Sequence, residues 1–138
     1  MYVIDASICV KWFIEEDDSE IAVSLKGSHL TGTDILIAPD LAIPETASAL
    51  FKSKLFSPAE IKSCIKQLYE LDIDFISLSS DLILLAIELA SVKSISIYDA
   101  IYPATAKELG FPFITADKKM YAKVSDPHSV TLLSDIKT

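Results

Sequence analysis

The sequence contains no arginine, so its twelve basic residues are all lysines. Twenty acidic residues outnumber them, and the net charge is −8 at pH 7. An acidic chain does not gather nucleic acid through bulk charge. Any phosphate contacts must come from lysines, which act as point charges and lack the bidentate geometry of arginine. If several of the carboxylates converge, however, they need a metal ion or a cationic partner to offset their repulsion.

Long hydrophobic runs are also missing. The longest apolar patch, residues 82–90, is interrupted by Glu88 and is shorter than the roughly 18 residues of a membrane-spanning helix. The chain does not open with a basic segment, so we expect no secretory signal and a cytoplasmic location. Apolar residues nevertheless make up 51% of the chain, which predicts a well-filled core and some apolar surface for a partner.

Cysteine and histidine are scarce and dispersed. Cys9 and Cys64 lie far apart without a CxxC motif, which predicts two buried free thiols in a reducing compartment. His29 and His128 are isolated, and we expect both in loops. The lack of His and Cys at ligand spacing argues against a zinc site.

The apolar pattern predicts strands that alternate with helices over the whole chain, within a single domain spanning residues 1–138. The predicted strands cover residues 2–5, 35–39, 73–78, 111–115 and 130–133. The predicted helices cover residues 8–13, about 17–27, 41–52, 57–71, 79–92, 98–109 and 116–124. This alternation predicts an α/β fold, a three-layer α/β/α sandwich around a mainly parallel sheet of four to five strands.

Three of the predicted helices carry specific signals. Ser57 and Glu60 form a capping-box sequence with a proline between them, a strong helix start. The segment 79–92 is apolar nearly all round, which predicts a helix that is central or covered by a partner. Pro103 interrupts the helix at 98–109, which predicts either a kink or a helix start near Tyr102.

Acidic residues lie at the predicted strand ends and helix starts. Asp5 ends the first strand, Glu45 follows the second, and Asp117 follows the fourth. Asp99 begins the helix before the fourth strand. Any one of them could simply cap a helix or complement its dipole. In parallel sheets, however, functional residues gather beyond the carboxyl ends of the strands, so all four could meet there.

Carboxylates in such numbers indicate a particular chemistry. Hard oxygen ligands suit Mg²⁺ or Mn²⁺, and such an ion activates water for phosphodiester cleavage. Ser7 lies two residues after Asp5, and Thr115 two residues before Asp117. Both could hydrogen-bond a carboxylate or a water and fix its orientation. Ordinary turn and capping chemistry is the alternative for both.

Four segments that contain these acids carry a resemblance in sequence order. They are YVIDAS at 2–7, APDLAIPETASAL at 38–50, SIYDAIYPATAKELG at 96–110 and FITADKKM at 113–120. The set resembles the PIN domain family, and within it the single-domain VapC-type toxin nucleases of toxin–antitoxin pairs. The resemblance implies that Asp5, Glu45, Asp99 and Asp117 form an acidic cluster that binds Mg²⁺ or Mn²⁺ and hydrolyses RNA. It also implies adjacent first and fourth strands, an antitoxin partner and a homodimer.

Several lysines lie on segments near the predicted acidic cluster and are candidate RNA contacts, although each could equally belong to a solvated helix face. They are Lys11, Lys52, Lys54, Lys118, Lys119 and Lys123.

Three other functions remain as alternatives. The first is an RNA-processing nuclease of the same family without an antitoxin. The second is a metal-dependent binding module with the pattern D-x-S-x-S, although Cys9 occupies the fifth place here. The third is a response-regulator receiver, which needs paired acids at the first strand, whereas Asp5 stands alone.

Overall fold

The computed structural model describes residues 1–126 and 129–137. The strands are β1 (Tyr2–Ile4), β2 (Leu36–Pro39), β3 (Asp74–Ile76), β4 (Phe113–Thr115) and β5 (Val130–Leu132). The helices are α1 (Ala6–Val10), α2 (Ser19–Leu30), α3 (Ala42–Ser53), α4 (Pro58–Glu70), α5 (Ser80–Lys93), α6 (Ile97–Leu109) and α7 (Lys118–Val124). A short 3₁₀ helix, η1 (Leu133–Asp135), follows β5.

The strands form one parallel sheet in the order β3-β2-β1-β4-β5. Val3 of β1 pairs with Phe113 of β4, and Ile4 pairs with Ile114, as the adjacency of the first and fourth strands predicted. The strand order reverses between β1 and β4, which is where such sheets bind ligands. A receiver sheet has the order 2-1-3-4-5, so the receiver alternative is wrong.

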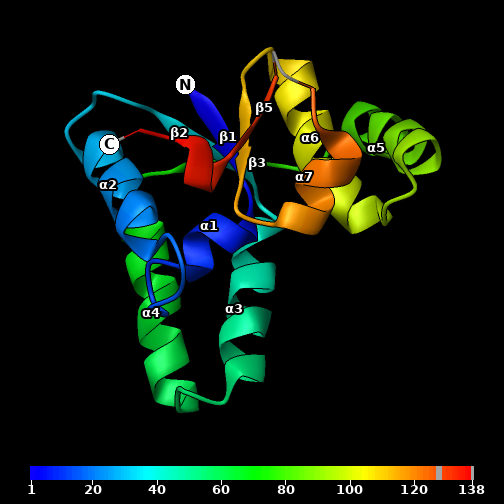
Figure 1. Cartoon of the computed structure of the whole chain (residues 1–138). Coiled ribbons are helices and arrows are strands. Elements are labelled where there is room, and N and C mark those ends of the chain that lie inside the picture. Colours follow the sequence, from blue (N-terminus) through cyan, green and yellow to red (C-terminus); the bar gives the residue numbers. More distant parts are fainter. Residues whose placement is uncertain (127–128, 138) are drawn as a thin grey trace.

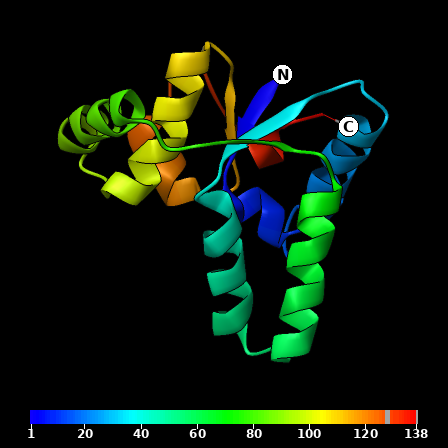
Figure 2. The same cartoon turned by 180° about the vertical axis from the view of Figure 1, so that it is seen from behind.

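Helices cover the sheet on both sides, as the prediction of a three-layer α/β sandwich required (Figure 1). In both views α5, α6 and α7 lie on one side, and α2 and α4 lie on the other (Figure 2). Helices α3 and α4 run side by side and project away from the sheet as a hairpin. The fully buried side chains of Ile4, Leu36 and Phe113 fill the centre of the core.

Local sequence signals account for several helix boundaries. Ser57 and Glu60 form the predicted capping box, and Pro58 takes the first position of α4. The predicted start of α6 near Tyr102 is wrong, because Ser96 caps the helix by accepting a hydrogen bond from the Asp99 N–H at 3.0 Å. From there α6 continues through Pro103 to Leu109.

Two other expectations are corrected. Of the two alternatives for the apolar helix α5, the central position is wrong, because α5 packs mainly against α6 and leaves Leu84 and Val92 exposed, and cover by a partner stays a prediction. His29 is not in a loop but is buried in α2. Its Nδ1 accepts a hydrogen bond from the Leu36 N–H at 3.1 Å, so its Nε2–H donates to the Leu71 carbonyl at 2.8 Å. His128 lies outside the described residues.

Both cysteines are buried free thiols, as predicted. Within residues 1–126 and 129–137, no helix has the length and apolar character that crossing a membrane requires.

Candidate active site

A cleft of about 220 Å³ opens beyond the carboxyl ends of β1 and β4. It is lined by Asp5, Ala6, Ser7, Val10, Glu45, Ala49, Asp99, Tyr102, Asp117 and Met120. All four acids singled out in the sequence therefore lie around one cleft. The described lining contains no basic residue, no histidine and no cysteine.

Asp5 forms the buried floor of this cleft and is only 4% exposed. It occupies the N-cap position of α1, yet its side chain makes no capping hydrogen bond. Instead, Ser7 Oγ donates a hydrogen bond to Oδ1, and Thr115 Oγ1 donates to Oδ2 at 2.5 Å. Helix capping therefore does not explain this carboxylate.

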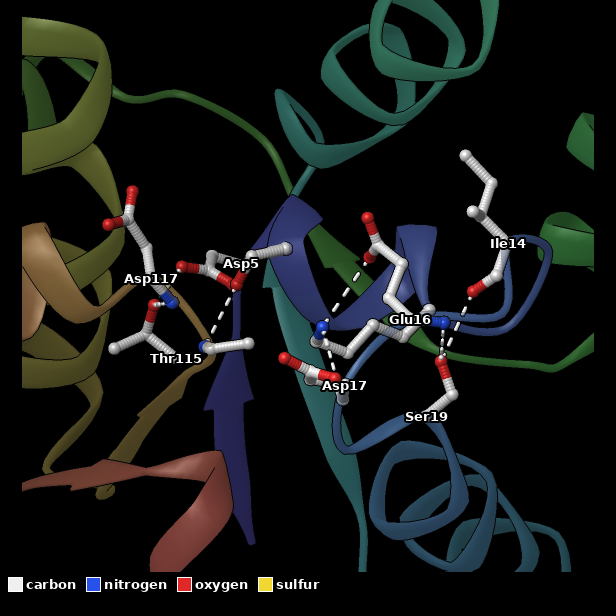
Figure 3. A network of polar contacts seen from close by, with 10 residues as sticks. Asp5, Ile14, Glu16, Asp17, Ser19, Thr115 and Asp117 are labelled. Atoms are coloured by element: carbon white, nitrogen blue, oxygen red, sulfur yellow. Dashed lines mark hydrogen bonds and ion pairs between the residues drawn. The ribbon is translucent and has the colours of Figure 1, made fainter. Parts of the chain in front are cut away.

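The main chain of the segment after β4 orients the two hydroxyl groups. Figure 3 shows Thr115 next to Asp5 and Asp117. Ser7 Oγ accepts from the Ala116 N–H at 2.9 Å, and Thr115 Oγ1 accepts from the Asp117 N–H at 3.1 Å. A hydroxyl group has one proton to donate, and here both protons point at Asp5. Two donors that converge on one carboxyl group suit its ionised form.

The pKa of Asp5 is raised to about 6. Burial is the main cause, and the neighbouring charge of Asp117 adds to it, whereas the hydrogen bonds from Ser7 and Thr115 lower it. At pH 7 the carboxyl group of Asp5 is mostly ionised, but burial makes its charged form less stable than it would be in water. A nearby cation would stabilise this charged form.

Asp117 is exposed and is the N-cap residue of α7. Its Oδ1 accepts a hydrogen bond from the Met120 N–H at 3.0 Å, so it does cap the helix, as the simplest interpretation of the sequence allowed. This capping bond involves only Oδ1, and Oδ2 takes no part in it.

Glu45 and Asp99 approach the cleft from helices, and both are half-buried. Glu45 lies in the first turn of α3, where the Tyr102 hydroxyl donates a hydrogen bond to its Oε1. Burial raises the pKa of Glu45, the bond from Tyr102 lowers it, and the charge of Asp99 raises it. Sequence reasoning missed Tyr102, although its position three residues after Asp99 on one helix was a usable signal.

The donor set of this cleft fits a hard divalent cation, because it consists of carboxylate and hydroxyl oxygens. Within the described residues, however, no three His, Cys, Asp or Glu side chains stand arranged to hold an ion. Oxygens of Asp5 and Glu45 instead accept hydrogen bonds from hydroxyl groups. Holding an ion therefore requires some side chains to rotate, which is easiest for the exposed Asp117 and the half-buried Asp99.

Comparison with known families gives a match to the PIN domain model over residues 2–126. The chain belongs to the PIN domain family. No curated protein sequence matches this PIN domain significantly.

Solved structures share the fold of this PIN domain. A toxin–antitoxin complex from Klebsiella pneumoniae superposes with a TM-score of 0.72 and 16% identity, covering 99% of this chain and 100% of the other. VapC20 of Mycobacterium tuberculosis, described as a Sarcin-Ricin loop cleaving toxin, gives 0.71 and 15%, covering 88% and 94%. PAE2754 from Pyrobaculum aerophilum gives 0.67 and 22%, covering 96% and 90%.

Two of the six candidate lysines of the PIN domain are already engaged within the chain. Lys11 Nζ contacts Glu16 Oε1 at 3.4 Å and donates to the Asp17 carbonyl at 2.7 Å. Figure 3 shows Glu16 and Asp17 in the segment after α1, apart from Asp5, Thr115 and Asp117. Lys123 Nζ donates to the Ser94 carbonyl at 3.1 Å.

The other four candidate lysines are exposed. Lys118 and Lys119 open α7 directly after Asp117, whereas Lys52 and Lys54 lie at the far end of α3 from Glu45. Their contact with RNA stays a prediction.

Proposed function

We propose that this PIN domain is a metal-dependent endoribonuclease of the cytoplasm and the toxin of a type II toxin–antitoxin pair. The observation that carries the proposal is the cleft around Asp5, Glu45, Asp99 and Asp117, which lacks a basic residue among the described residues. Four carboxylates from segments far apart in sequence leave a negative site that a divalent cation neutralises. Residues 1–138 act as one nuclease domain in this proposal.

The four carboxylates would hold Mg²⁺ or Mn²⁺. When bound, such an ion lowers the pKa of water and offsets charge on a phosphodiester. Ser7 and Thr115 fix the Asp5 carboxylate from two sides, so its position does not depend on the substrate. Attack of water on phosphorus with departure of the 3′ oxygen leaves a 5′-phosphate and a 3′-hydroxyl.

A toxin role is supported by the solved structures that share this fold, which include a toxin–antitoxin complex and an RNA-cleaving toxin. It is also supported by the apolar side chains on the surface, because exposed apolar groups mark partner sites. The most exposed among the described residues include Phe51, Leu55, Leu84, Val92 and Tyr98. We propose that an antitoxin and a second copy of the chain cover parts of this surface.

The metal-dependent binding module is less well supported than a nuclease. Its pattern needs a hydroxyl ligand at the fifth place, where this chain has Cys9. Cys9 is fully buried, and burial raises the pKa of its thiol to about 12, so it is an inert core residue.

Incubation of the purified protein with total RNA, with and without Mn²⁺, tests the proposal. We expect cleavage only with Mn²⁺, 5′-phosphate ends, and no cleavage by Asp5→Asn. Circular dichroism of both proteins ensures that loss of activity is not loss of fold. Undiminished cleavage by the variant, or equal cleavage in the presence of a chelator, would refute the assignment.

A further inference from the structure

Tyr102 holds its hydroxyl group at a fixed place beside the cleft. Its side chain is 2% exposed, and its ring lies nearly parallel to that of Phe113, with 6.3 Å between ring centroids and 7° between ring planes. Phe113 is itself fully buried in β4. Close packing in a protein core leaves such a ring little freedom, so the hydroxyl is positioned by the core and not by the solvent.

The hydroxyl of Tyr102 links two separate parts of the structure. Tyr102 lies on α6, which packs against α5 and the sheet, whereas Glu45 lies on α3, which packs against α1 and α4. The hydrogen bond from the phenol to Glu45 Oε1 joins them across the cleft. Tyr102 and Asp99 are one helical turn apart, so both face this cleft from the same side.

The acceptor is a carboxylate, which makes the bond stronger than one between neutral groups. A half-buried glutamate otherwise samples several rotamers, and it loses this freedom when it binds an ion. A bond to one oxygen removes the freedom in advance and leaves the second oxygen available. Core packing alone does not require this arrangement, because the ring of phenylalanine would fill the same space.

We propose that Tyr102 is a positioning residue of the metal site, whose hydroxyl holds Glu45 Oε1 so that Oε2 is presented to a divalent cation. The inference rests on the proposed function, because it takes Glu45 as a ligand. It predicts that the tyrosine hydroxyl acts on metal affinity through Glu45 and through no other group.

The first test measures Mn²⁺ binding to the protein without RNA, by electron paramagnetic resonance of free Mn²⁺ into the millimolar range. Tyr102→Phe keeps the ring and its contact with Phe113, and we expect about 10-fold weaker Mn²⁺ binding, the usual effect of losing a hydrogen bond that orients a ligand. Tyr2→Phe is the matched control, because Tyr2 is half-buried at the opposite end of β1 from Asp5. It should leave the affinity unchanged.

The second test repeats Tyr102→Phe in a Glu45→Ala background, where the substitution should have no further effect on Mn²⁺ affinity. The inference would be overturned by an equal loss of Mn²⁺ affinity in both backgrounds or by an unchanged affinity in the single variant. Failure of Tyr102→Phe to fold would also overturn it. In each case the role of the Tyr102 hydroxyl would be structural. If the unsubstituted protein does not bind Mn²⁺, the metal-dependent function itself is refuted. If Glu45→Ala weakens binding and Tyr102→Phe does not, the function stands and only this inference falls.

Discussion

The two halves of the acidic cleft are built differently. In the strand half, Asp5, Ser7, Thr115 and Asp117 follow or end the central strands β1 and β4 and are tied together by four hydrogen bonds. In the helix half, Glu45 and Asp99 are half-buried on α3 and α6. One hydrogen bond from Tyr102 holds Glu45 there.

The difference separates fixed groups from adaptable ones. Asp5 cannot move without breaking bonds to two hydroxyl groups that are themselves held by the main chain. Asp99 can rotate, since it is only half-buried, whereas Glu45 is held at one oxygen by the hydrogen bond from Tyr102. The strand half would therefore fix the position of a cation in this cleft, and the helix half would complete its coordination.

Among the substitutions that leave the buried Asp5 in place, the largest expected effect comes from removing the charge of Asp117 in the strand half. Asparagine caps helices as well as aspartate does, so Asp117→Asn should change the free energy of unfolding by less than about 0.5 kcal/mol. RNA cleavage should fall by more than about 100-fold, because the loss of a ligand exceeds the loss of a group that orients one. Asp81→Asn, at an exposed first-turn position of α5, is the control and should cleave normally. Full activity of Asp117→Asn would limit this residue to capping.

The deep burial of Asp5 in the strand half should make the stability of the protein depend on pH. Its pKa is about 6 in the folded protein, against 3.8 for the free group. The folded state therefore binds more protons between these values, and stability falls as pH rises through this range. Relative to Asp5→Asn, the unsubstituted protein should lose about 2 kcal/mol between pH 4 and pH 7. Urea unfolding in a chelator measures this, and a difference that does not change with pH would contradict it.

Removing the two hydrogen bonds of the Thr115 hydroxyl in the strand half should lower the stability of the protein. Thr115 is fully buried, and Thr115→Val keeps the shape while it deprives Asp5 of a donor and the Asp117 N–H of an acceptor. We expect a loss of about 1–3 kcal/mol in the free energy of unfolding.

The control for this substitution is Thr105→Val. Thr105 is equally buried, but its hydroxyl only donates to the Ile101 carbonyl of its own helix at 2.7 Å. Its loss should stay below about 1 kcal/mol. Equal losses at the two positions would show that the strand half is no more strongly tied than an ordinary helix.

The smallest effect should come from the lysines beyond the helix half. Lys52→Gln with Lys54→Gln should weaken RNA binding a few-fold and reduce the slope of log affinity against log salt by about 1.4. Lys11→Gln should have less effect, because Lys11 is paired with Glu16. Fluorescence anisotropy in an Asp5→Asn background separates binding from cleavage. An unchanged dependence of RNA affinity on salt would show that Lys52 and Lys54 do not contact RNA.

The strand half could be anticipated from the sequence because its signals are local. Asp5 directly follows an apolar run, Asp117 directly follows another, and parallel strands bring their carboxyl ends to one edge. The fifth strand and the capping box of Ser57 were found in the same way. The roles of the four acids as ligands stay a prediction.

The remaining features depend on contacts between distant residues. Tyr102 and Glu45 are separated by 57 positions, and periodicity cannot say that the phenol and the carboxylate meet. His29 bonds Leu71 from 42 positions away, which a search for ligand spacing cannot detect. Apolar residues all around α5 indicated a helix that is covered by other parts of a protein. The sequence does not say whether those parts belong to this chain or to a partner.

The pairing of β1 with β4 also sets when the cleft can exist. During synthesis Asp5 is made 110 positions before its partner Thr115. Until β4 has been synthesised and has taken its place beside β1, Asp5 has neither Thr115 nor Asp117 next to it. A growing chain therefore carries no complete site until Thr115 and Asp117 have been made, and a product that stops before Thr115 never acquires one.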